Sequence, residues 1–175
     1  MSAKLKKGLV QIYTGNGKGK TTASLGLALR ASGAGLKVCV LQFIKKRPYS
    51  EIKALKKIKN IEVAQYGRGC FIRKKPSPAD IKCAKQGLEK AKRVLASSKF
   101  DMLILDEANI ALKLGLLTPE EIITLVKMKP RNVELILTGR SCPGRLFRYA
   151  DLITDMREIK HPYNKGVKAR PGIEF

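Results

Sequence analysis

Residues 14–22, Thr-Gly-Asn-Gly-Lys-Gly-Lys-Thr-Thr, combine the residue types that bind phosphate groups. Glycines let several backbone N–H groups converge on one anion, and a helix that starts at the end of such a loop adds the positive end of its dipole. Lys20 can reach a phosphate, and the Thr21 hydroxyl can coordinate Mg²⁺. The spacing of these residues therefore predicts a P-loop, which binds a polyphosphate.

Two related patterns fit this stretch less well. The usual P-loop pattern, Gly-x-x-x-x-Gly-Lys-[Ser/Thr], has a glycine where this chain has Thr14, although the Gly-Lys-Thr at the helix entry is intact. The dinucleotide-binding pattern Gly-x-Gly-x-x-Gly fails because Lys20 takes the place of its third glycine. A glycine-rich turn with solvated lysines is the remaining alternative, and the flanking sequence argues against it.

That flanking sequence predicts the elements that hold the loop. Residues 9–13 form an apolar, β-prone run and residues 23–31 are rich in Ala and Leu, so the loop joins a strand to a helix. Residues 33–35, Gly-Ala-Gly, end the helix, and residues 37–43 have the pattern of a second buried strand. Strand, helix and strand in this order predict a parallel sheet with helical crossovers.

Two acids follow another apolar run. Residues 102–105 are apolar, and Asp106 and Glu107 come directly after them. The carboxyl ends of parallel strands meet at one edge of a sheet, so these acids are expected beside the P-loop, where Mg²⁺ would lie. This is the pattern of a Walker B strand.

The rest of the chain predicts further elements around these two motifs. Ser77 and Thr118 are expected to cap helices that begin at Pro78 and Pro119. Residues 67–78 are too rich in glycine and proline for regular structure, and their apolar residues suit either a binding loop or the core. The other expected elements are a short helix within 44–60, strands at 61–66, 132–138 and 151–159, the last at a sheet edge, and an irregular tail at 160–175.

Together these elements predict an α/β fold of three layers, the P-loop NTPase (RecA-like) arrangement. The sheet is expected to be mostly parallel, with about six strands and one antiparallel edge strand. A chain of 175 residues has the size of one domain, which we expect to span 1–175 with a short basic tail at 1–7.

The composition is strongly basic, with 36 Lys and Arg against 14 Asp and Glu and a formal net charge of +22. Such a surface attracts nucleic acid, a nucleoside triphosphate or an acidic protein, and it also suits high solubility or a hot habitat, so charge alone does not choose. No apolar run could span a bilayer and no signal core follows the basic N-terminus, so we expect a cytoplasmic protein. The four cysteines form no Cys-x-x-Cys pair and are expected to be reduced thiols: Cys39, Cys70, Cys83 and Cys142.

The predicted site leaves two reactions open. His161 is the only histidine and lies in the tail, so acid–base groups beyond the two carboxylates are scarce. If Glu107 orients a water against the γ-phosphate, the protein is an ATPase, stimulated by nucleic acid in view of its charge. If a second substrate brings a nucleophile that needs no deprotonation, the site need only hold the triphosphate as a leaving group.

The motifs, taken in order, resemble the P-loop family of ATP:corrinoid adenosyltransferases. The resemblance rests on five blocks, which together are more specific than a P-loop alone: residues 14–22, the strand end Val40–Lys45, residues 105–109 (Leu-Asp-Glu-Ala-Asn), residues 137–140 (Leu-Thr-Gly-Arg), and the ending from Lys160-His161-Pro162 to Gly172-Ile173-Glu174-Phe175. It implies that the Co(I) centre of a reduced corrinoid attacks C5′ of ATP and displaces triphosphate. Co(I) carries no proton to remove, which suits the shortage of general bases.

The resemblance also implies roles for individual residues. Lys20 and Glu107 are expected to be catalytic, with Thr21 and Glu107 as ligands of Mg²⁺ and Asp106 as an acid behind them. Phe71 is expected to touch the corrinoid. The residues expected to bind ATP, the co-substrate, are Gly15, Asn16, Gly17, Lys18, Gly19, Lys20, Thr21, Thr22, Arg30 and Arg140.

Partners and departures follow from the same resemblance. It implies a homodimer and an acidic electron donor such as flavodoxin, which a +22 protein would attract, while a membrane or nucleic-acid partner is not implied. Many members carry Gly-x-Gly-Phe-x-Trp where residues 67–72 read Gly-Arg-Gly-Cys-Phe-Ile, so the phenylalanine is one position late and the tryptophan is absent. Some relatives also have a longer N-terminal segment that covers the site, where this chain has seven residues before Gly8.

Overall fold

The computed structural model describes residues 4–47, 49–69, 72 and 75–175. Six strands form one sheet in the order β3-β2-β4-β5-β1-β6, and every pair of neighbours in it is parallel. The strands are β1 (Val10–Thr14), β2 (Val38–Lys45), β3 (Ile61–Gly69), β4 (Met102–Asp106), β5 (Glu134–Thr138) and β6 (Leu152–Asp155).

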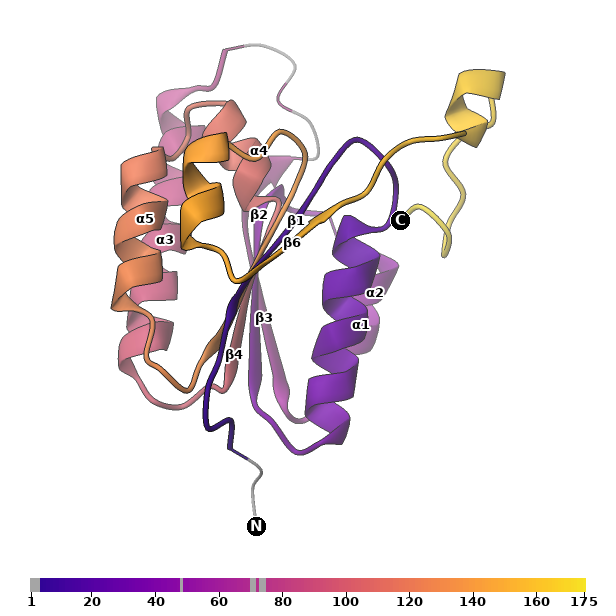
Figure 1. Cartoon of the computed structure of the whole chain (residues 1–175). Helices are drawn as coiled ribbons and strands as arrows, with labels where there is room; N and C mark the ends of the chain where they lie inside the picture. Colours follow the sequence, from indigo (N-terminus) through magenta and orange to yellow (C-terminus); the bar gives the residue numbers. More distant parts are fainter. Residues whose placement is uncertain (1–3, 48, 70–71, 73–74) are drawn as a thin grey trace.

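Helices cover both faces of this sheet and make the three predicted layers (Figure 1). One face carries α1 (Lys20–Gly33) and α2 (Ser50–Leu55). The other carries α3 (Pro78–Ala96), α4 (Ala108–Lys113), α5 (Pro119–Met128) and the 3₁₀ helix η1 (Gly144–Tyr149), while a second 3₁₀ helix, η2 (Pro162–Lys165), lies in the tail. The central strands are buried on both faces, so they need continuous apolar runs rather than alternation.

The core is divided by the sheet into two clusters. The larger one packs beneath α3, α4 and α5 and includes Phe43, Leu88 and Leu103. The smaller one packs beneath α1 and includes Leu25 and Ile104. Consecutive residues of β4, such as Leu103 and Ile104, face opposite clusters, as the alternation of a strand requires.

Two helix starts follow the predicted caps. The Ser77 hydroxyl accepts a hydrogen bond from the Asp80 backbone N–H, and the Asp80 carboxylate accepts one from the Ser77 N–H. Thr118 and Glu121 form the same reciprocal pair at the start of α5. Both capping predictions are therefore confirmed.

The antiparallel edge strand was a wrong expectation. β6 does lie at an edge, but it pairs with β1 in parallel, with Gln11 opposite Leu152 and Tyr13 opposite Thr154. The reason is the connection from β5, which runs through η1 back to the end of the sheet where β1 begins, so the chain re-enters in the same direction. Two strand boundaries also differ, because β3 extends to Gly69 and β6 ends at Asp155, while the short helix expected within 44–60 is confirmed as α2.

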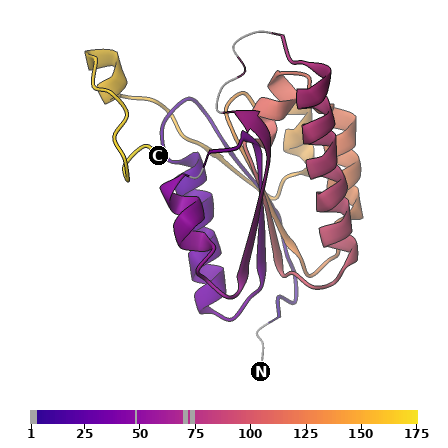
Figure 2. The ribbon, with the colours of Figure 1, turned by 180° about the vertical axis from the view of Figure 1, so that it is seen from behind.

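After β6 the chain leaves the body of the protein and projects beyond α1 before it folds back (Figures 1 and 2). This tail is irregular apart from η2, as predicted, and it is largely exposed. Its end is fixed by the Glu174 carboxylate, 2.9 Å from Nζ of Lys18, and by the Phe175 carbonyl, which accepts a 3.2 Å hydrogen bond from the Ser50 hydroxyl. The tail therefore returns to the P-loop and to α2.

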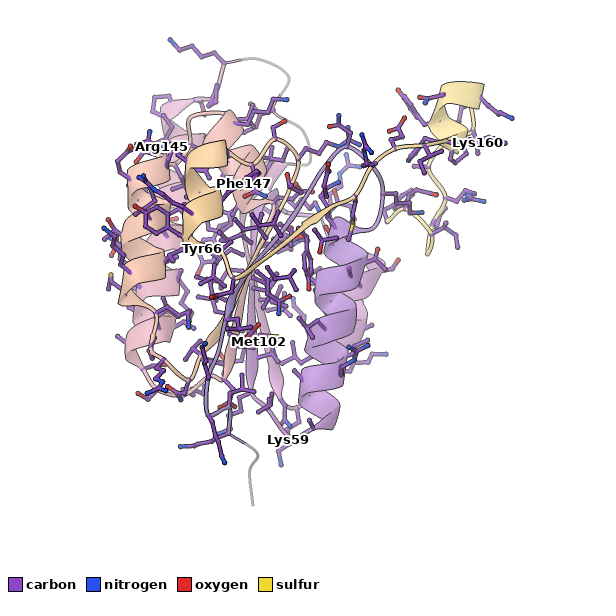
Figure 3. All side chains as sticks on the ribbon, viewed as in Figure 1. Lys59, Tyr66, Met102, Arg145, Phe147 and Lys160 are labelled. Carbon is purple, nitrogen blue, oxygen red and sulfur yellow. The ribbon has the colours of Figure 1, made fainter. Side chains whose placement is uncertain are left out.

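The positive charge is spread over the molecule. Figure 3 shows the labelled cations Lys59, Arg145 and Lys160 at three separate places, the last on the projecting tail.

Among the described residues, no helix is both long enough and apolar enough to cross a bilayer.

Candidate functional site

The P-loop lies between β1 and α1 and needs glycine at several positions. Gly15 and Gly19 have φ angles of 93° and 119°, in the left-handed region that glycine adopts without strain. The Gly17 N–H donates a 2.6 Å hydrogen bond to the Met156 carbonyl, which follows β6. A Cβ atom on Gly15 or Gly17 would lie 2.5–2.6 Å from that same carbonyl oxygen. The end of β6 therefore supports the loop, and side chains at these glycines would displace it.

Lys20, the first residue of α1, is held inside the loop. Its ammonium donates a 2.6 Å hydrogen bond to the Gly17 carbonyl, and the residue is only 8% exposed. Burial lowers the pKa of Lys20 below its usual range, and the nearby Arg140 guanidinium lowers it further. The ammonium is thus poorly solvated in the free protein, and a polyanion in the loop would supply the charge that it lacks.

Asp106, at the end of β4, is fully buried and accepts hydrogen bonds on both carboxylate oxygens. Oδ1 accepts from the Thr21 hydroxyl at 2.8 Å and from the Thr138 hydroxyl at 2.7 Å. Oδ2 accepts from the Gln42 amide at 2.9 Å and from the Lys45 ammonium at 3.3 Å. Burial alone would raise the pKa of Asp106, but the Lys45 charge and the three neutral donors keep it below the usual value. The acid is ionised and its acceptor sites are occupied.

The sheet order explains how these partners meet. β4 lies between β2 and β5, and Gln42 stands directly opposite Asp106 in the register of β2 and β4. Thr138 is the last residue of β5, on the other side of β4. Gln42 is itself oriented by the Gln65 amide, which donates to its side-chain oxygen at 2.7 Å. The carboxyl ends of β2, β4 and β5, together with the first turn of α1, therefore hold the Asp106 carboxylate in place.

Glu107 differs from Asp106 in backbone and in surroundings. Its φ is 60°, a left-handed conformation that is uncommon for a residue other than glycine, and its N–H donates a 3.1 Å hydrogen bond to Oγ1 of Thr138. Its carboxylate lies 3.4 Å from the Lys45 ammonium and is partly exposed. Burial raises the pKa of Glu107 by more than the Lys45 charge lowers it, and the charge of Asp106 adds to the rise. Glu107 is thus the acid that remains open to a ligand.

These groups fit Mg²⁺ by their chemistry. Magnesium takes oxygen ligands, and in nucleotide sites it is held by one or two carboxylates together with substrate phosphates. The Thr21 hydroxyl donates its hydrogen bond to Asp106, which leaves the lone pairs of the oxygen available, and Glu107 supplies a partly exposed carboxylate nearby. Among the described residues there is no group of three or more His, Cys, Asp and Glu side chains that could hold a metal. Phosphate oxygens of the nucleotide would complete the coordination.

The other residues predicted to bind ATP lie in different parts of the structure. Asn16, Lys18 and Thr22 are exposed on the loop and the first turn of α1. Arg140 follows Gly139 at the carboxyl edge of the sheet and acts on the charge of Lys20, so it lies at the site. Arg30 lies in the last turn of α1, where its charge acts on the Tyr13 phenol, and a contact between Arg30 and nucleotide stays a prediction. Phe71, the residue predicted to touch the corrinoid, lies outside the described residues.

A cavity of about 530 Å³ reaches Ile44, the neighbour in sequence of Lys45, which contacts both acids. It lies where β2 and β3 end and α3 begins, and its wall includes Ile44, the residue before Lys45. Its lining combines apolar and cationic side chains, among them Tyr66, Arg68, Ile72, Lys75 and Leu116. A second ligand could therefore approach the P-loop from this side.

Three residues of the site had no role assigned from the sequence: Gln42, Lys45 and Thr138. The signal available was a polar residue near the carboxyl end of a buried apolar strand, where burial without a partner is costly. That signal does not say which partner satisfies each residue. Asn109 is also buried here and donates a 3.0 Å hydrogen bond to the Gly139 carbonyl, which ties α4 to the loop after β5.

A search of solved structures finds the same fold. The KaiC-like protein PH0186 from the hyperthermophilic archaeon Pyrococcus horikoshii OT3 superposes with a TM-score of 0.56, covering 88% of this chain and 75% of that one. The two sequences are 19% identical, so the likeness concerns the fold alone.

Sequence comparisons identify the family. The family model "ATP:corrinoid adenosyltransferase BtuR/CobO/CobP" matches residues 6–175. The chain is 35% identical over 170 residues to the corrinoid adenosyltransferase of Escherichia coli K12, covering 97% of this chain and 87% of that one. It is 34% identical over 173 residues to the corrinoid adenosyltransferase CobA of Salmonella typhimurium LT2, covering 99% and 88%. The chain therefore belongs to the ATP:corrinoid adenosyltransferase family, and its activity is the ATP-dependent transfer of an adenosyl group to a corrinoid.

Proposed function

We propose that this transfer takes place at the P-loop, with the triphosphate of ATP as leaving group and the corrinoid entering from the cavity at the ends of β2 and β3. The electron pair of Co(I) forms the new bond to C5′ of the ribose, and the bond from C5′ to the triphosphate oxygen breaks with its electrons on that oxygen. No proton moves in this step, so no general base is needed. The products are an adenosylcorrinoid, such as adenosylcobalamin or a precursor of it, and triphosphate.

The observation that carries this proposal is the position of the cavity relative to the loop. Its wall reaches Ile44 and Gly67, one residue and one strand away from Lys45, which in turn contacts both acids. A site that only hydrolyses ATP has no second organic substrate and would not need such an opening. Asp106 also suits transfer, because hydrogen bonds occupy both of its carboxylate oxygens and hold it in place.

The chain's own residues stabilise the departing charge. The Lys20 ammonium, buried in the loop, would donate to a phosphate oxygen in place of the Gly17 carbonyl, and Arg140 adds a second positive group at the same edge. Thr21 and Glu107 would hold Mg²⁺, with Asp106 fixing the Thr21 hydroxyl. Bound Mg²⁺ neutralises triphosphate charge. Backbone N–H groups of the loop would bind the remaining oxygens, apart from that of Gly17, which donates to the Met156 carbonyl.

The corrinoid would occupy the cavity at the ends of β2 and β3. Arg68 and Lys75 offer hydrogen-bond donors there, while Tyr66 and Leu116 offer apolar contact. Phe71 follows β3 in sequence and stays a predicted corrinoid contact. This mixture of a mostly apolar surface with a few directed donors is typical of cofactor-sized ligands.

Other partners are proposed on less direct grounds. The formal charge of +22 favours an acidic electron donor, such as a flavodoxin, for the reduction that produces Co(I). A homodimer is proposed because β6 and the tail leave apolar side chains exposed, among them Leu152, Ile153 and Ile159. A cytoplasmic location is proposed because ATP, the co-substrate of the family, is supplied there. We also propose that residues 1–175 act as one domain.

The deciding assay mixes the protein with Mg-ATP and chemically reduced cobalamin under anaerobic conditions. Loss of the Co(I) absorption together with stoichiometric triphosphate is the expected result. The competing function, an ATPase stimulated by nucleic acid, predicts ADP and phosphate with the Co(I) spectrum unchanged, and that outcome would refute adenosyl transfer.

A further inference from the structure

Lys45 lies between the two acids of the site. Its ammonium is 3.3 Å from Oδ2 of Asp106 and 3.4 Å from Oε1 of Glu107, and its side chain is 18% exposed. The ammonium is thus a cation held between two carboxylates. In the protein without nucleotide, the acid pair therefore already has a counter-cation.

The backbone at the end of β2 is distorted in a way that brings Lys45 there. Ile44 has a φ of 69°, a left-handed conformation that is an outlier for a β-branched residue, and the pairing with β3 shifts register between Ile44 and Lys45. Phe43 and Ile44, although consecutive, both pack in the larger core cluster, which an unbroken strand does not allow. The irregularity therefore turns the following residue away from the position that strand alternation would give it.

β3 is adapted to this distortion. Gly67 stands opposite Ile44, and a Cβ atom on it would lie 2.0 Å from the Ile44 carbonyl oxygen and 2.1 Å from the carbonyl carbon. Only glycine fits so close to a neighbouring backbone. The strained Ile44 and the required Gly67 together set the backbone conformation that places Lys45. Strain of this kind is typical of functional positions.

Further contacts keep the Lys45 side chain in place. Its ammonium lies 5.6 Å from the centre of the Tyr49 ring, and the Glu51 carboxylate adds a weaker attraction from α2. The cation is thus attracted by Asp106 at the end of β4, by Glu107 just before α4, and by Tyr49 and Glu51 at the start of α2. A divalent ion that bound Glu107 without nucleotide would have to displace the Lys45 ammonium against the attraction of all these groups.

We propose that Lys45 is a positioning residue that serves as the resident cation of the acid pair and makes metal entry conditional on nucleotide. The proposal rests on the proposed role of Glu107 as a magnesium ligand. Without nucleotide, a divalent ion at Glu107 would meet the Lys45 ammonium, which lies 3.4 Å from that carboxylate, and the repulsion between the two cations keeps the ion's affinity low. When the metal arrives with ATP, the triphosphate brings additional ligands for the metal and a new anionic partner for the Lys45 ammonium. The metal and the nucleotide then bind as one unit.

The test measures Mn²⁺ binding in the absence of nucleotide, from the electron paramagnetic resonance signal of free Mn²⁺. Four proteins are compared: wild type, Lys45→Met, Lys45→Arg, and Lys46→Met, which removes an exposed cation from the same strand end. We expect Lys45→Met to bind one Mn²⁺ at least about tenfold more tightly than the wild type, because a like charge has gone. Lys45→Arg and Lys46→Met should bind as weakly as the wild type. Circular dichroism checks the fold, and Lys45→Gln replaces Lys45→Met if the latter does not fold.

A fifth protein, the double variant Lys45→Met with Glu107→Gln, separates the proposed role of Lys45 from the proposed role of Glu107 as a magnesium ligand. Loss of the gained Mn²⁺ affinity in this variant would place the ion at the acid pair, as we expect. Equal weak binding by Lys45→Met and wild type would overturn the role of Lys45 and leave adenosyl transfer untouched. Tight binding that survives Glu107→Gln would overturn the magnesium assignment together with the role of Lys45. Adenosyl transfer itself is judged by the separate assay with reduced cobalamin.

Discussion

The Thr21 hydroxyl donates a 2.8 Å hydrogen bond to Oδ1 of Asp106, joining the first turn of α1 to the end of β4 across 85 positions of sequence. The proton of Thr21 is thereby directed at the carboxylate, and the oxygen lone pairs remain for a metal. The same carboxylate holds Thr138, Gln42 and Lys45. Asp106 therefore holds four neighbouring side chains in place.

Asp106→Asn should damage stability and activity together. In asparagine an NH₂ group replaces one carboxylate oxygen, and it would face side chains that donate hydrogen bonds to Asp106 in the wild type. The Lys45 cation would also lose its buried anionic partner. We expect a loss of about 3 kcal/mol in the free energy of unfolding and a fall in activity of about 10–100-fold. Urea titration and the cobalamin assay measure the two effects. The double variant with Lys45→Met should lose less stability than the sum of the single variants, and strict additivity would mean that the two side chains do not interact.

Lys20→Ala should abolish activity and leave the fold intact. The ammonium interacts with one loop carbonyl in the free protein, and its proposed partner is the triphosphate. We expect a fall in adenosyl transfer of about 10²–10³-fold, with circular dichroism and the melting temperature close to those of the wild type. Lys53→Ala, which removes an exposed lysine of α2, is the control and should keep full activity. Wild-type turnover by Lys20→Ala would show that the phosphates bind elsewhere.

Two glycines allow a matched test of the P-loop's packing. Gly15 and Gly35 both have left-handed φ angles, 93° and 83°, but a Cβ on Gly15 would collide with Asp155 and Met156, whereas one on Gly35 would meet open space. Gly35→Ala should therefore cost only the backbone strain, about 1 kcal/mol, and Gly15→Ala at least about 2 kcal/mol with lost ATP binding. Thermal melts and nucleotide titrations measure both. Equal effects of the two substitutions would argue against the contact between β6 and the loop.

Glu107→Gln should stabilise the nucleotide-free protein while it removes activity. Burial raises the pKa of Glu107 in the folded state, so the charged carboxylate is less stable there than in the unfolded chain. This penalty is absent below the unfolded pKa and grows as pH rises through the folded pKa. At pH 7.5 the variant should melt about 2–4 °C above the wild type, and the gain should vanish near about pH 4. A lower melting temperature at neutral pH would show that the pair with Lys45 outweighs burial.

The local elements of the fold were readable from the sequence because each has a local cause. Glycines next to Lys20 and Thr21, between a β-prone run and an Ala/Leu-rich run, indicated a tight loop before a helix. The reciprocal caps at Ser77 and Thr118 mark the starts of α3 and α5 within three residues. The apolar run before Asp106 predicted a strand covered on both faces, which is what β4 is. The five ordered motifs were enough to indicate the family.

What only the tertiary structure decided are contacts between segments far apart in sequence. Nothing local shows that Gln42 and Thr138 flank Asp106, because that depends on β4 lying between β2 and β5. The direction of β6 depends on the path of the chain through η1, and its four exposed residues carry too weak a pattern to fix it. The position of Lys45 between two acids follows from the left-handed backbone at Ile44, a conformation against the preference of its own side chain, which packing against Gly67 of the next strand maintains.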